Sequence, residues 1–453
     1  MHIHPDFLER MRSLLDEEFA DFERCLHEPP VIGLRANTLK IDPRSLQRRV
    51  IFEMQPVPWC PAGFVIQKEA TTKQSAPGKI PEHAAGLYYL QEPSAIAVAE
   101  ILEPQPGERV LDLAAAPGGK STHIISLMKN EGLLVSNEIR SQRVWELAEN
   151  LERWGATNTI ITQESPTRLA SRLEGFFDRV LVDAPCSGEG MFRKSENARR
   201  DWSPELVMSC SVRQKAILSD AARMVRPGGI LVYSTCTFSK EENEEVISQL
   251  LANNRDFVLE DIKQVAGASS DMPGTLRLMP HRIHGEGHFI ASLQREGGML
   301  AESRKPMKRE RLPASALESY REFCQGMGIS AVPEEHLQIS GSYLYKKMEL
   351  APDLFGVRVI HPGLWLGTIH HSERNSIRFE PAHALAMALP PQQVQHIAVL
   401  DRQAIVEYLK GMPISLPGPD GWVLACMDQY SMGWGKRVKG IVKNYYPRGL
   451  RWH

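Results

Sequence analysis

The segment LDLAAAPGGKSTHI, Leu111 to Ile124, has the pattern of a short apolar strand that ends in a tight turn, followed by the start of a helix. Its Gly119-Lys120-Ser121 matches the end of the triphosphate-binding motif G-x-x-x-x-G-K-[ST]. The first glycine of that motif would fall at position 114, which is Ala114. The dinucleotide fingerprint G-x-G-x-x-G does not fit either. The turn therefore predicts a ligand that approaches the backbone closely without a pyrophosphate cradle.

The chain beyond this turn alternates short apolar strands with helices, a pattern typical of a parallel sheet covered on both faces. A late strand over residues 288–295 is expected to pair with residues 257–262. The helix that follows the last parallel strand is expected to be capped by Ser239, with Glu242 three residues on. The expected strands cover 109–113, 133–136, 159–162, 179–182 and 230–234, and the main expected helices cover 141–154, 209–225 and 240–251.

Glu138 distinguishes between the ligands that such a turn can hold. It follows the second strand, 18 residues beyond Lys120, where an acidic side chain in a doubly wound sheet accepts hydrogen bonds from ribose hydroxyls. A ribose partner without a phosphate cradle predicts S-adenosylmethionine as the cofactor. In the alternative interpretation, Gly118 and Gly119 merely open a helix and Glu138 is a solvated strand end. If the turn instead binds a nucleoside triphosphate, the alternative function is that of an NTPase.

Two further loops place a cysteine after the fourth and fifth strands. They are DAPCSGEGMFRK, Asp183 to Lys194, and YSTCTFSKEEN, Tyr233 to Asn243. Ligands of open α/β sheets bind at the carboxyl ends of the strands, so Cys186 and Cys236 are expected to face the cofactor crevice. The other five cysteines are expected to be buried, as free cysteines usually are: Cys25, Cys60, Cys210, Cys324 and Cys426.

Thiols at this position suit chemistry on a pyrimidine. Cytosine C5 is a poor nucleophile, but addition of a thiolate at C6 makes C5 enamine-like and able to attack a methyl sulfonium. An acid hydrogen-bonded to N3 assists the addition, and Asp183 lies at the strand tip where it could do so. The base must also leave any stack and enter a pocket.

Composition restricts the class of protein. The chain has 453 residues, enough for two or three domains, and seven scattered cysteines without metal-type spacing, so we expect reduced thiols, no metal and a cytoplasmic location. No signal peptide or membrane span is visible.

Residues 6–27 predict one amphipathic helix. Residues 431–453 carry six Lys and Arg, no acid and the aromatic residues Trp434, Tyr445, Tyr446 and Trp452, which predicts an RNA-binding surface.

These motifs together closely resemble the Nop/Sun (Fmu) family of RNA cytosine-C5 methyltransferases, nearest to its bacterial members that act on small-subunit ribosomal RNA. The resemblance runs through RANTLK (35–40), YYLQEPSA, LDLAAAPGGK, NEIRSQR, both cysteine loops, RLMPHRIHGEGHF (277–289) and the closing MGWGKRVKGIVKNYYPRGLR, and so covers most of the chain. It implies an α/β class I (Rossmann-like) S-adenosylmethionine methyltransferase core. A small α+β N-terminal domain and a C-terminal PUA-like, β-rich RNA-binding domain are expected to flank this core.

The resemblance also implies roles for residues. Cys236 would attack C6, Cys186 would assist product release and Asp183 would contact the base, with Lys120 expected close to the target base. Arg143 would lie near the ribose held by Glu138. The cofactor would lie along Ala114, Ala115, Ala116, Pro117, Gly118, Gly119 and Lys120. After the third strand the family often has an acid near the adenine; here the spacing gives Ser165, beside Glu164, so this contact is a departure from the family pattern.

The expected domain organisation is an RNA-recognition-like unit over 1–80, a methyltransferase domain over 81–297, a linker over 298–313, an intermediate domain over 314–388 and a PUA-like domain over 389–453. The expected partner is 16S ribosomal RNA or the small ribosomal subunit, with the chain a monomer and no membrane involved. Three alternatives remain: the same chemistry on tRNA, a non-catalytic ribosome-assembly or RNA-binding factor, and the NTPase.

Overall fold

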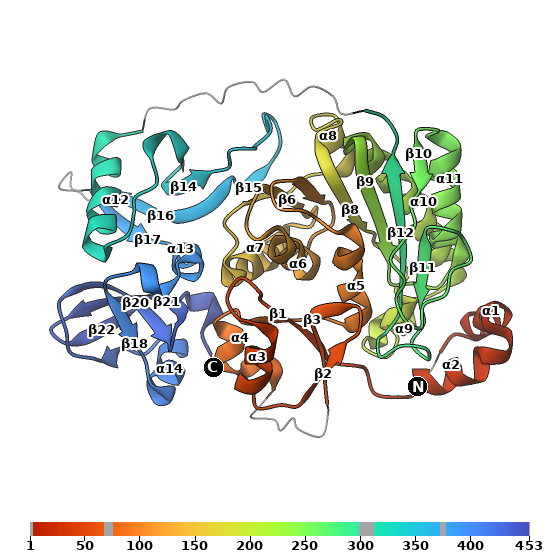
Figure 1. Cartoon of the computed structure of the whole chain (residues 1–453), viewed down its shortest axis with the longest axis horizontal. Helices are drawn as coiled ribbons and strands as arrows, with labels where there is room; N and C mark the ends of the chain where they lie inside the picture. Colours follow the sequence, from red (N-terminus) through yellow and green to blue (C-terminus); the bar gives the residue numbers. More distant parts are fainter. Residues whose placement is uncertain (1–2, 68–75, 299–311, 372–376, 453) are drawn as a thin grey trace.

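The computed structural model describes residues 3–67, 76–298, 312–371 and 377–452 (Figure 1). Four sheets are present in this part of the chain. The largest has nine strands, in the order β10-β12-β9-β8-β5-β6-β7-β15, with β11 paired to β12. Its strands are β5 (Arg109–Asp112), β6 (Leu133–Asn137), β7 (Thr159–Thr162), β8 (Phe177–Asp183), β9 (Val225–Thr235), β10 (Phe257–Leu259), β11 (Thr275–Leu278), β12 (His288–Arg295) and β15 (Val359–His361).

The five strands β5 to β9 are parallel, as the alternating pattern predicts, and β12 pairs with β9 in the antiparallel direction. β10 pairs with β12, which confirms the expected pairing of residues 257–262 with the late strand. Strand β5 lies between β6 and β8, so the strand order reverses there. Open α/β sheets bind ligands at such a switch point, outside the carboxyl ends of the strands.

Side chains alternate between the two faces of this sheet and give each face its own core. Val110 packs under α5 (Pro93–Leu102), α6 (Gly119–Met128) and α7 (Ser141–Trp154). Its neighbour Leu111 packs under the opposite layer, which consists of α8 (Pro166–Ala170), α10 (Pro204–Met224) and α11 (Glu244–Asn253). The sheet is therefore a buried middle layer, which is why its strands read as continuous apolar runs.

The N-terminal part folds as two separate pieces. An antiparallel sheet of order β2-β3-β1-β4 carries α3 (Pro43–Arg49) and α4 (Pro81–Ala84); its strands are β1 (Gly33–Ala36), β2 (Met54–Val57), β3 (Cys60–Ile66) and β4 (Tyr88–Leu90). The single helix expected over 6–27 is wrong. The chain forms α1 (Pro5–Leu15) and α2 (Phe19–Leu26), broken at Asp16, whose φ is 46°. Phe7 and Phe22 pack on Trp202 and Phe238 beside the central sheet.

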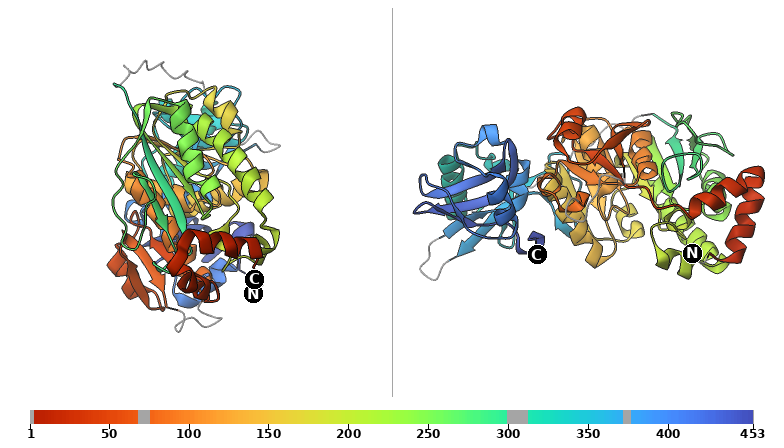
Figure 2. Two further views of the ribbon diagram at one scale, coloured as in Figure 1. Left: turned by 90° about the vertical axis from the view of Figure 1, so that its right-hand side faces the viewer. Right: turned by 90° about the horizontal axis from the view of Figure 1, so that it is seen from below.

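The C-terminal part contains two more sheets, on the opposite side of the central sheet from α1 and α2 (Figure 2). The sheet β13-β14-β16-β17 carries α12 (Ala314–Met327) and α13 (His383–Ala388), and the sheet β18-β20-β21-β22-β19 carries α14 (Arg402–Leu409). Their strands are β13 (Leu337–Ser340), β14 (Tyr343–Lys347), β16 (Gly363–His371), β17 (Ile377–Pro381), β18 (Ile397–Val399), β19 (Ile414–Ser415), β20 (Gly421–Met427), β21 (Tyr430–Val438) and β22 (Ile441–Asn444). The predicted linker lies mostly outside the described residues.

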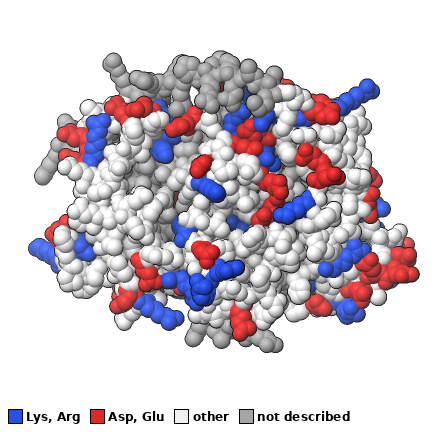
Figure 3. Space-filling view, in the orientation of Figure 1, with Lys and Arg blue, Asp and Glu red and all other residues white. Residues whose placement is uncertain are grey.

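The sequence suggested that the aromatic residues near the C-terminus lie on the surface, but two of them are buried. Trp434 and Tyr446 are buried in apolar cores, and the indole nitrogen of Trp434 donates to the carbonyl of Ala382. Only Tyr445 and Trp452 keep part of their surface exposed. In the face of the molecule drawn in Figure 3, basic and acidic side chains are interspersed. Among the described helices none has the length and apolar character needed to cross a bilayer.

Candidate active site

The turn between β5 and α6 is held by its neighbours in the sheet. The amide of Leu113 donates to the carbonyl of Leu181 at 3.0 Å, and that of Ala115 donates to the carbonyl of Asn137 at 2.8 Å. Gly118 has a φ of 111°, which favours glycine, and a Cβ on Gly119 would lie 3.2 Å from the Tyr89 ring. Gly118 is therefore required by the shape of the turn, and a side chain at position 119 would have to displace the Tyr89 ring.

Glu138 directly follows β6 and lies beside this turn. Its carboxylate is 3.4 Å from the guanidinium of Arg143, and Arg143 also donates to the carbonyl of Ala116. A second carboxylate oxygen accepts from the amide of Arg140 at 2.9 Å. Glu138 is 3 % exposed. The structure thus brings together the turn and Glu138, which the sequence grouped by spacing, and Arg143, which the resemblance placed beside them.

Ser165 lies after β7, next to the same edge of the sheet. Its hydroxyl accepts from the amide of Arg168 and caps α8, and its own amide donates to the carboxylate of Glu164 at 3.0 Å. The side chain of Asn137 fixes the backbone of Glu164 through two hydrogen bonds, of 3.0 Å each. The residues after β6 and β7 therefore form one connected rim.

Lys120 and Asp183 form an ion pair across this edge. The Lys120 ammonium donates to Asp183 Oδ2 at 2.6 Å, and the Ser234 hydroxyl donates to Asp183 Oδ1 at 2.8 Å. Burial alone would raise the pKa of Asp183, but the Lys120 ammonium and His288 together outweigh it and hold that pKa well below its ordinary range. The same pair raises the pKa of Lys120 against the opposing effect of burial. At neutral pH this is a carboxylate facing an ammonium.

The two cysteine loops meet beside this ion pair. Asp183 and Ser234 are register partners on β8 and β9, so the residues that follow them leave the sheet side by side. Cys186 Sγ and Cys236 Sγ are 3.2 Å apart, and both thiols are free and partly exposed. The hydrogen bond with Cys236, together with burial, raises the pKa of Cys186. The other five cysteines are buried, as predicted.

Glu242 ties these two loops together and does not cap a helix, which corrects the expectation from the sequence. Its carboxylate accepts from the amide and hydroxyl of Ser187 and from Thr237 Oγ1, the residues that follow Cys186 and Cys236. The predicted cap, Ser239, instead donates to Glu189 at 2.6 Å. Residues Lys240–Glu242 form a short 3-10 turn, and α11 begins only at Glu244.

Two buried residues at this edge were not selected from the sequence. Asp112, the last residue of β5, accepts from Ser121 Oγ at 2.7 Å, and burial raises its pKa to about 7. His288, the first residue of β12, has its Nε2 3.8 Å from Asp183 Oδ1. Asp112 belongs to the quoted LDLAAAPGGK motif and His288 belongs to GEGHF. Both residues were therefore inside the motifs, but their spacing gave no reason to assign either of them a contact in the site.

The N-terminal sheet reaches the same turn through Arg35 of the RANTLK segment. The guanidinium donates to the carbonyl of Gly119 at 3.1 Å, to Thr122 Oγ1 at 2.7 Å and to Gln91 Oε1 at 3.1 Å. Arg35 is fully buried and lies over the Trp154 ring. These contacts fix the first turn of α6, which carries Lys120, to the N-terminal sheet.

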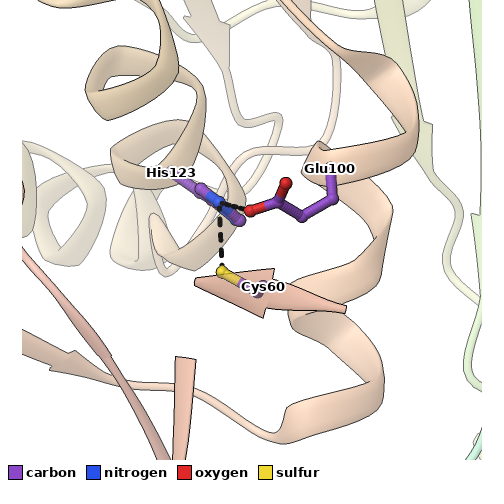
Figure 4. A group of neighbouring side chains, drawn as sticks. All are labelled: Cys60, Glu100 and His123. Carbon is purple, nitrogen blue, oxygen red and sulfur yellow. Dashed lines mark hydrogen bonds and ion pairs between the residues drawn. The ribbon is translucent and has the colours of Figure 1, made fainter. Parts of the chain in front are cut away.

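A separate polar cluster, Cys60, Glu100 and His123, is the one group among the described residues with the side chains and spacing of a metal site (Figure 4). His123 Nε2 is 3.0 Å from Glu100 Oε1 and 4.0 Å from Cys60 Sγ. Burial, reinforced by Glu100, raises the pKa of Cys60 to about 12, so without a metal ion Cys60 is a neutral thiol. The cluster connects β3 to α5 and α6 as a hydrogen-bonded anchor.

Four family models match the chain along its length. They describe the N-terminal domain of 16S rRNA methyltransferase RsmF (residues 3–93), 16S rRNA methyltransferase RsmB/F (99–294), the RsmF rRNA methyltransferase first C-terminal domain (322–389) and the methyltransferase RsmF PUA domain (396–452). Proteins named ribosomal RNA small subunit methyltransferase F from Salmonella agona and Klebsiella pneumoniae are each 32% identical over 98% of this chain, and 96% and 95% of their own lengths.

Solved structures agree with the fold. A methyltransferase homolog from Pyrococcus horikoshii is 32% identical and has a TM-score of 0.55, with 64% of this chain and 94% of that chain covered. NSun6 from the same organism, crystallised with SFG, shares the fold at 22% identity and a TM-score of 0.58, over 65% and 99% of the two chains. The α/β methyltransferase core, the N-terminal domain and the C-terminal PUA domain expected from the sequence are confirmed. The chain belongs to the RsmB/F family of 16S rRNA methyltransferases and carries the domains specific to RsmF.

Proposed function

We propose that this RNA methyltransferase forms 5-methylcytosine in 16S rRNA with S-adenosylmethionine as methyl donor, through a covalent bond between Cys236 and C6 of the target base. One observation carries the proposal: two thiols, 3.2 Å apart, lie beside a lysine–aspartate ion pair at the carboxyl edge of the sheet. A thiol nucleophile and a polar contact to the base ring are the groups that C5 methylation of cytosine requires.

The residues at the switch point suit an adenosyl cofactor. Glu138 presents a carboxylate to that edge, and it can accept hydrogen bonds from ribose hydroxyls. The residues from Ala114 to Lys120 would line the cofactor with backbone, and Arg143 fixes both the turn and Glu138. Ser165 would lie on the adenine side. When bound, S-adenosylmethionine supplies an electrophilic methyl group.

Cys236 is the better nucleophile of the two thiols. The raised pKa of Cys186 keeps that residue a neutral thiol, which can donate a hydrogen bond to a thiolate on Cys236. The Lys120 ammonium is also close enough to interact electrostatically with Cys236. The thiolate is the reactive form of cysteine, so this arrangement favours attack by Cys236 at C6.

Asp183 and Lys120 are proposed to hold the target cytosine. The polar edge of the ring, N3 and the exocyclic amine, presents both an acceptor and a donor. An ammonium and a carboxylate side by side complement that edge. Lys120 therefore has no phosphate to bind here, and the interpretation of its motif as a triphosphate loop is not supported by any family match.

Cys186 is proposed to act after methyl transfer. The C5 proton must leave and the bond between Cys236 Sγ and C6 must break before RNA is released. Cys186 Sγ is in direct contact with the sulfur that leaves, and its thiol can assist that departure. Loss of Cys186 should therefore trap the covalent complex rather than prevent its formation.

Ribosomal RNA is the proposed partner, with a monomeric chain acting in the cytoplasm. The family models name 16S rRNA and a PUA domain, which favours this substrate over tRNA and an enzyme over a passive assembly factor. Exposed Lys439 and Lys443 are proposed to contact phosphates, with Tyr445 and Trp452 available for base stacking.

The test is methyl transfer from labelled S-adenosylmethionine to 16S rRNA or small subunits, with bisulfite mapping of the product. Wild type should label one or more cytosines at C5, and Cys236→Ala should not. Cys210→Ala is the matched control, because Cys210 is buried on α10 and should leave activity intact. Full activity of Cys236→Ala would overturn the assignment.

A further inference from the structure

His288 lies next to the proposed catalytic groups, yet the mechanism above does not use it. It begins β12 and pairs with Leu278 of β11, and the next residue, Phe289, pairs with Thr235, which precedes Cys236. The side chain is buried. Its Nε2 has no hydrogen-bond partner among the described residues, and Asp183 Oδ1 lies 3.8 Å away. A buried ring nitrogen without a partner is costly and needs an explanation.

The other ring nitrogen, Nδ1, carries a proton. It is 2.9 Å from the carbonyl of Gly287, and a carbonyl can only accept. It is also 3.4 Å from Ser94 Oγ, which already donates its single proton to Glu92 and so can only accept from Nδ1. Two acceptors therefore face Nδ1, and it must be the donor to both.

With Nδ1 protonated, a neutral ring would point the lone pair of Nε2 at the Asp183 carboxylate. The Nε2 lone pair and the carboxylate oxygen are both hydrogen-bond acceptors, and two acceptors facing each other in a buried site repel. A second proton, on Nε2, converts this repulsion into an ion pair with Asp183. The charged groups around the ring favour that form: Asp183 on β8 and Glu92 at the start of α5 are both anionic, while Lys120 is paired with Asp183 and Lys194 interacts with Glu92.

We infer that His288 is the proton store of Asp183: as an imidazolium it supplies, through Asp183, the proton that N3 of the cytosine takes up when Cys236 adds to C6. This role rests on the proposed function. Asp183 alone is a carboxylate, paired with Lys120 and Ser234, and has no proton to give. His288 is therefore a positioning and proton-supplying residue that acts through Asp183.

The proton that N3 takes up starts on His288 and returns there, while the C5 proton leaves separately to a general base. As the Cys236 Sγ–C6 bond forms, the electron pair of the C5=C6 bond shifts through C4 to N3. Nε2 closes the 3.8 Å gap to hydrogen-bond distance and gives its proton to Asp183 Oδ1, and Asp183 gives a proton to N3, which leaves a neutral His288. When C5 has been methylated, has lost its proton to a base and the S–C6 bond has broken, the N3 proton returns through Asp183 to Nε2.

The test is the pH dependence of single-turnover methyl transfer, from about pH 5 to about pH 9, for wild type and His288→Gln. Glutamine keeps a polar side chain but cannot store a proton. The wild-type rate should fall on the alkaline side, because the proton that N3 takes up is then no longer held by His288. His288→Gln should be about 100-fold slower at its best pH, and its alkaline decline should be absent. His27→Gln, an exposed histidine, is the control and should keep the wild-type profile.

The outcomes separate the two claims. An alkaline decline that persists in His288→Gln, whether or not the rate is lower, assigns the residue a structural role and overturns the inference. If wild type does not methylate cytosine C5, or does so without Cys236, the proposed function itself fails. Should the glutamine variant not fold by circular dichroism, His288→Asn provides a smaller neutral replacement for the same measurement.

Discussion

The edge of the central sheet and the Cys60–Glu100–His123 cluster both combine a thiol, a carboxylate and a basic side chain. At the sheet edge the carboxylate of Asp183 is 31% exposed and both cysteines are partly exposed. In the other cluster the Cys60 and His123 side chains are 1% and 2% exposed. Side-chain composition therefore does not define a reactive site. Position at the carboxyl ends of parallel strands and access for a substrate do.

Substitution of the cysteines is expected to give the largest difference in methyl-transfer activity between the two clusters. Cys236→Ala should lower methyl transfer about a thousandfold or more, the size of loss found when a covalent nucleophile is removed. Cys60→Ala should leave the rate of transfer within a few-fold of wild type and act on stability. Equal losses of activity in the two variants, at equal folding, would contradict the distinction.

Lys120→Met is expected to have the next largest effect. It leaves Asp183 as a partly buried carboxylate without its ammonium, and removal of one such electrostatic contact typically lowers a rate by about 100-fold. The pKa of Asp183, now held low, should rise in the variant. The acid decline in activity should therefore begin at a higher pH than in wild type. A variant with the wild-type acid limb would show that Lys120 does not control Asp183.

The sequence could predict the sheet edge because parallel strands collect their carboxyl ends at one place. Ala114 to Lys120, Glu138, Cys186 and Cys236 all follow strands, so spacing alone located them. Glu242 and His288 could not be placed this way. Glu242 lay in a helix-cap pattern, and its bonds to Ser187 form only when two loops 50 residues apart meet. His288 reaches Asp183 only because β12 runs antiparallel beside β9.

The other errors have the same origin in tertiary packing. The helical pattern over residues 6–27 continues through Asp16, and only the packing of Phe7 and Phe22 on Trp202 and Phe238 requires a break there. Trp434 reads as a stacking residue beside lysines, but β21 turns its side chain into the core. The period of two shows that side chains alternate between the two faces of a strand, but it does not show which face is buried.

The anchor cluster should affect stability rather than rate. Glu100→Gln removes the carboxylate that accepts from His123, which should lower the free energy of unfolding by about 1–3 kcal/mol in urea denaturation. Methyl transfer by the folded variant should remain near the wild-type rate. Zinc added to wild type should leave the midpoint unchanged, because His123 and Glu100 are already bonded to each other; a rise in the midpoint that depends on Cys60 would instead indicate a metal site.

The smallest expected effect is a pH dependence of stability from His123. Burial lowers its pKa from 6.5 to about 4, with Arg35 contributing. Between those values the unfolded chain binds a proton that the folded chain does not, so stability falls as pH decreases through this range. His123→Gln should flatten that part of the stability curve. A curve of unchanged slope would contradict a neutral His123.

The most direct measurement of the central claim is detection of a covalent RNA–protein complex by denaturing gel and mass spectrometry. Cys186→Ala, incubated with 16S rRNA and S-adenosylmethionine, should accumulate a complex joined through Cys236 to a methylated cytosine. The double variant Cys186→Ala with Cys236→Ala should form none. Turnover by Cys186→Ala without any complex, or a complex that survives loss of Cys236, would contradict the assignment of the two thiols.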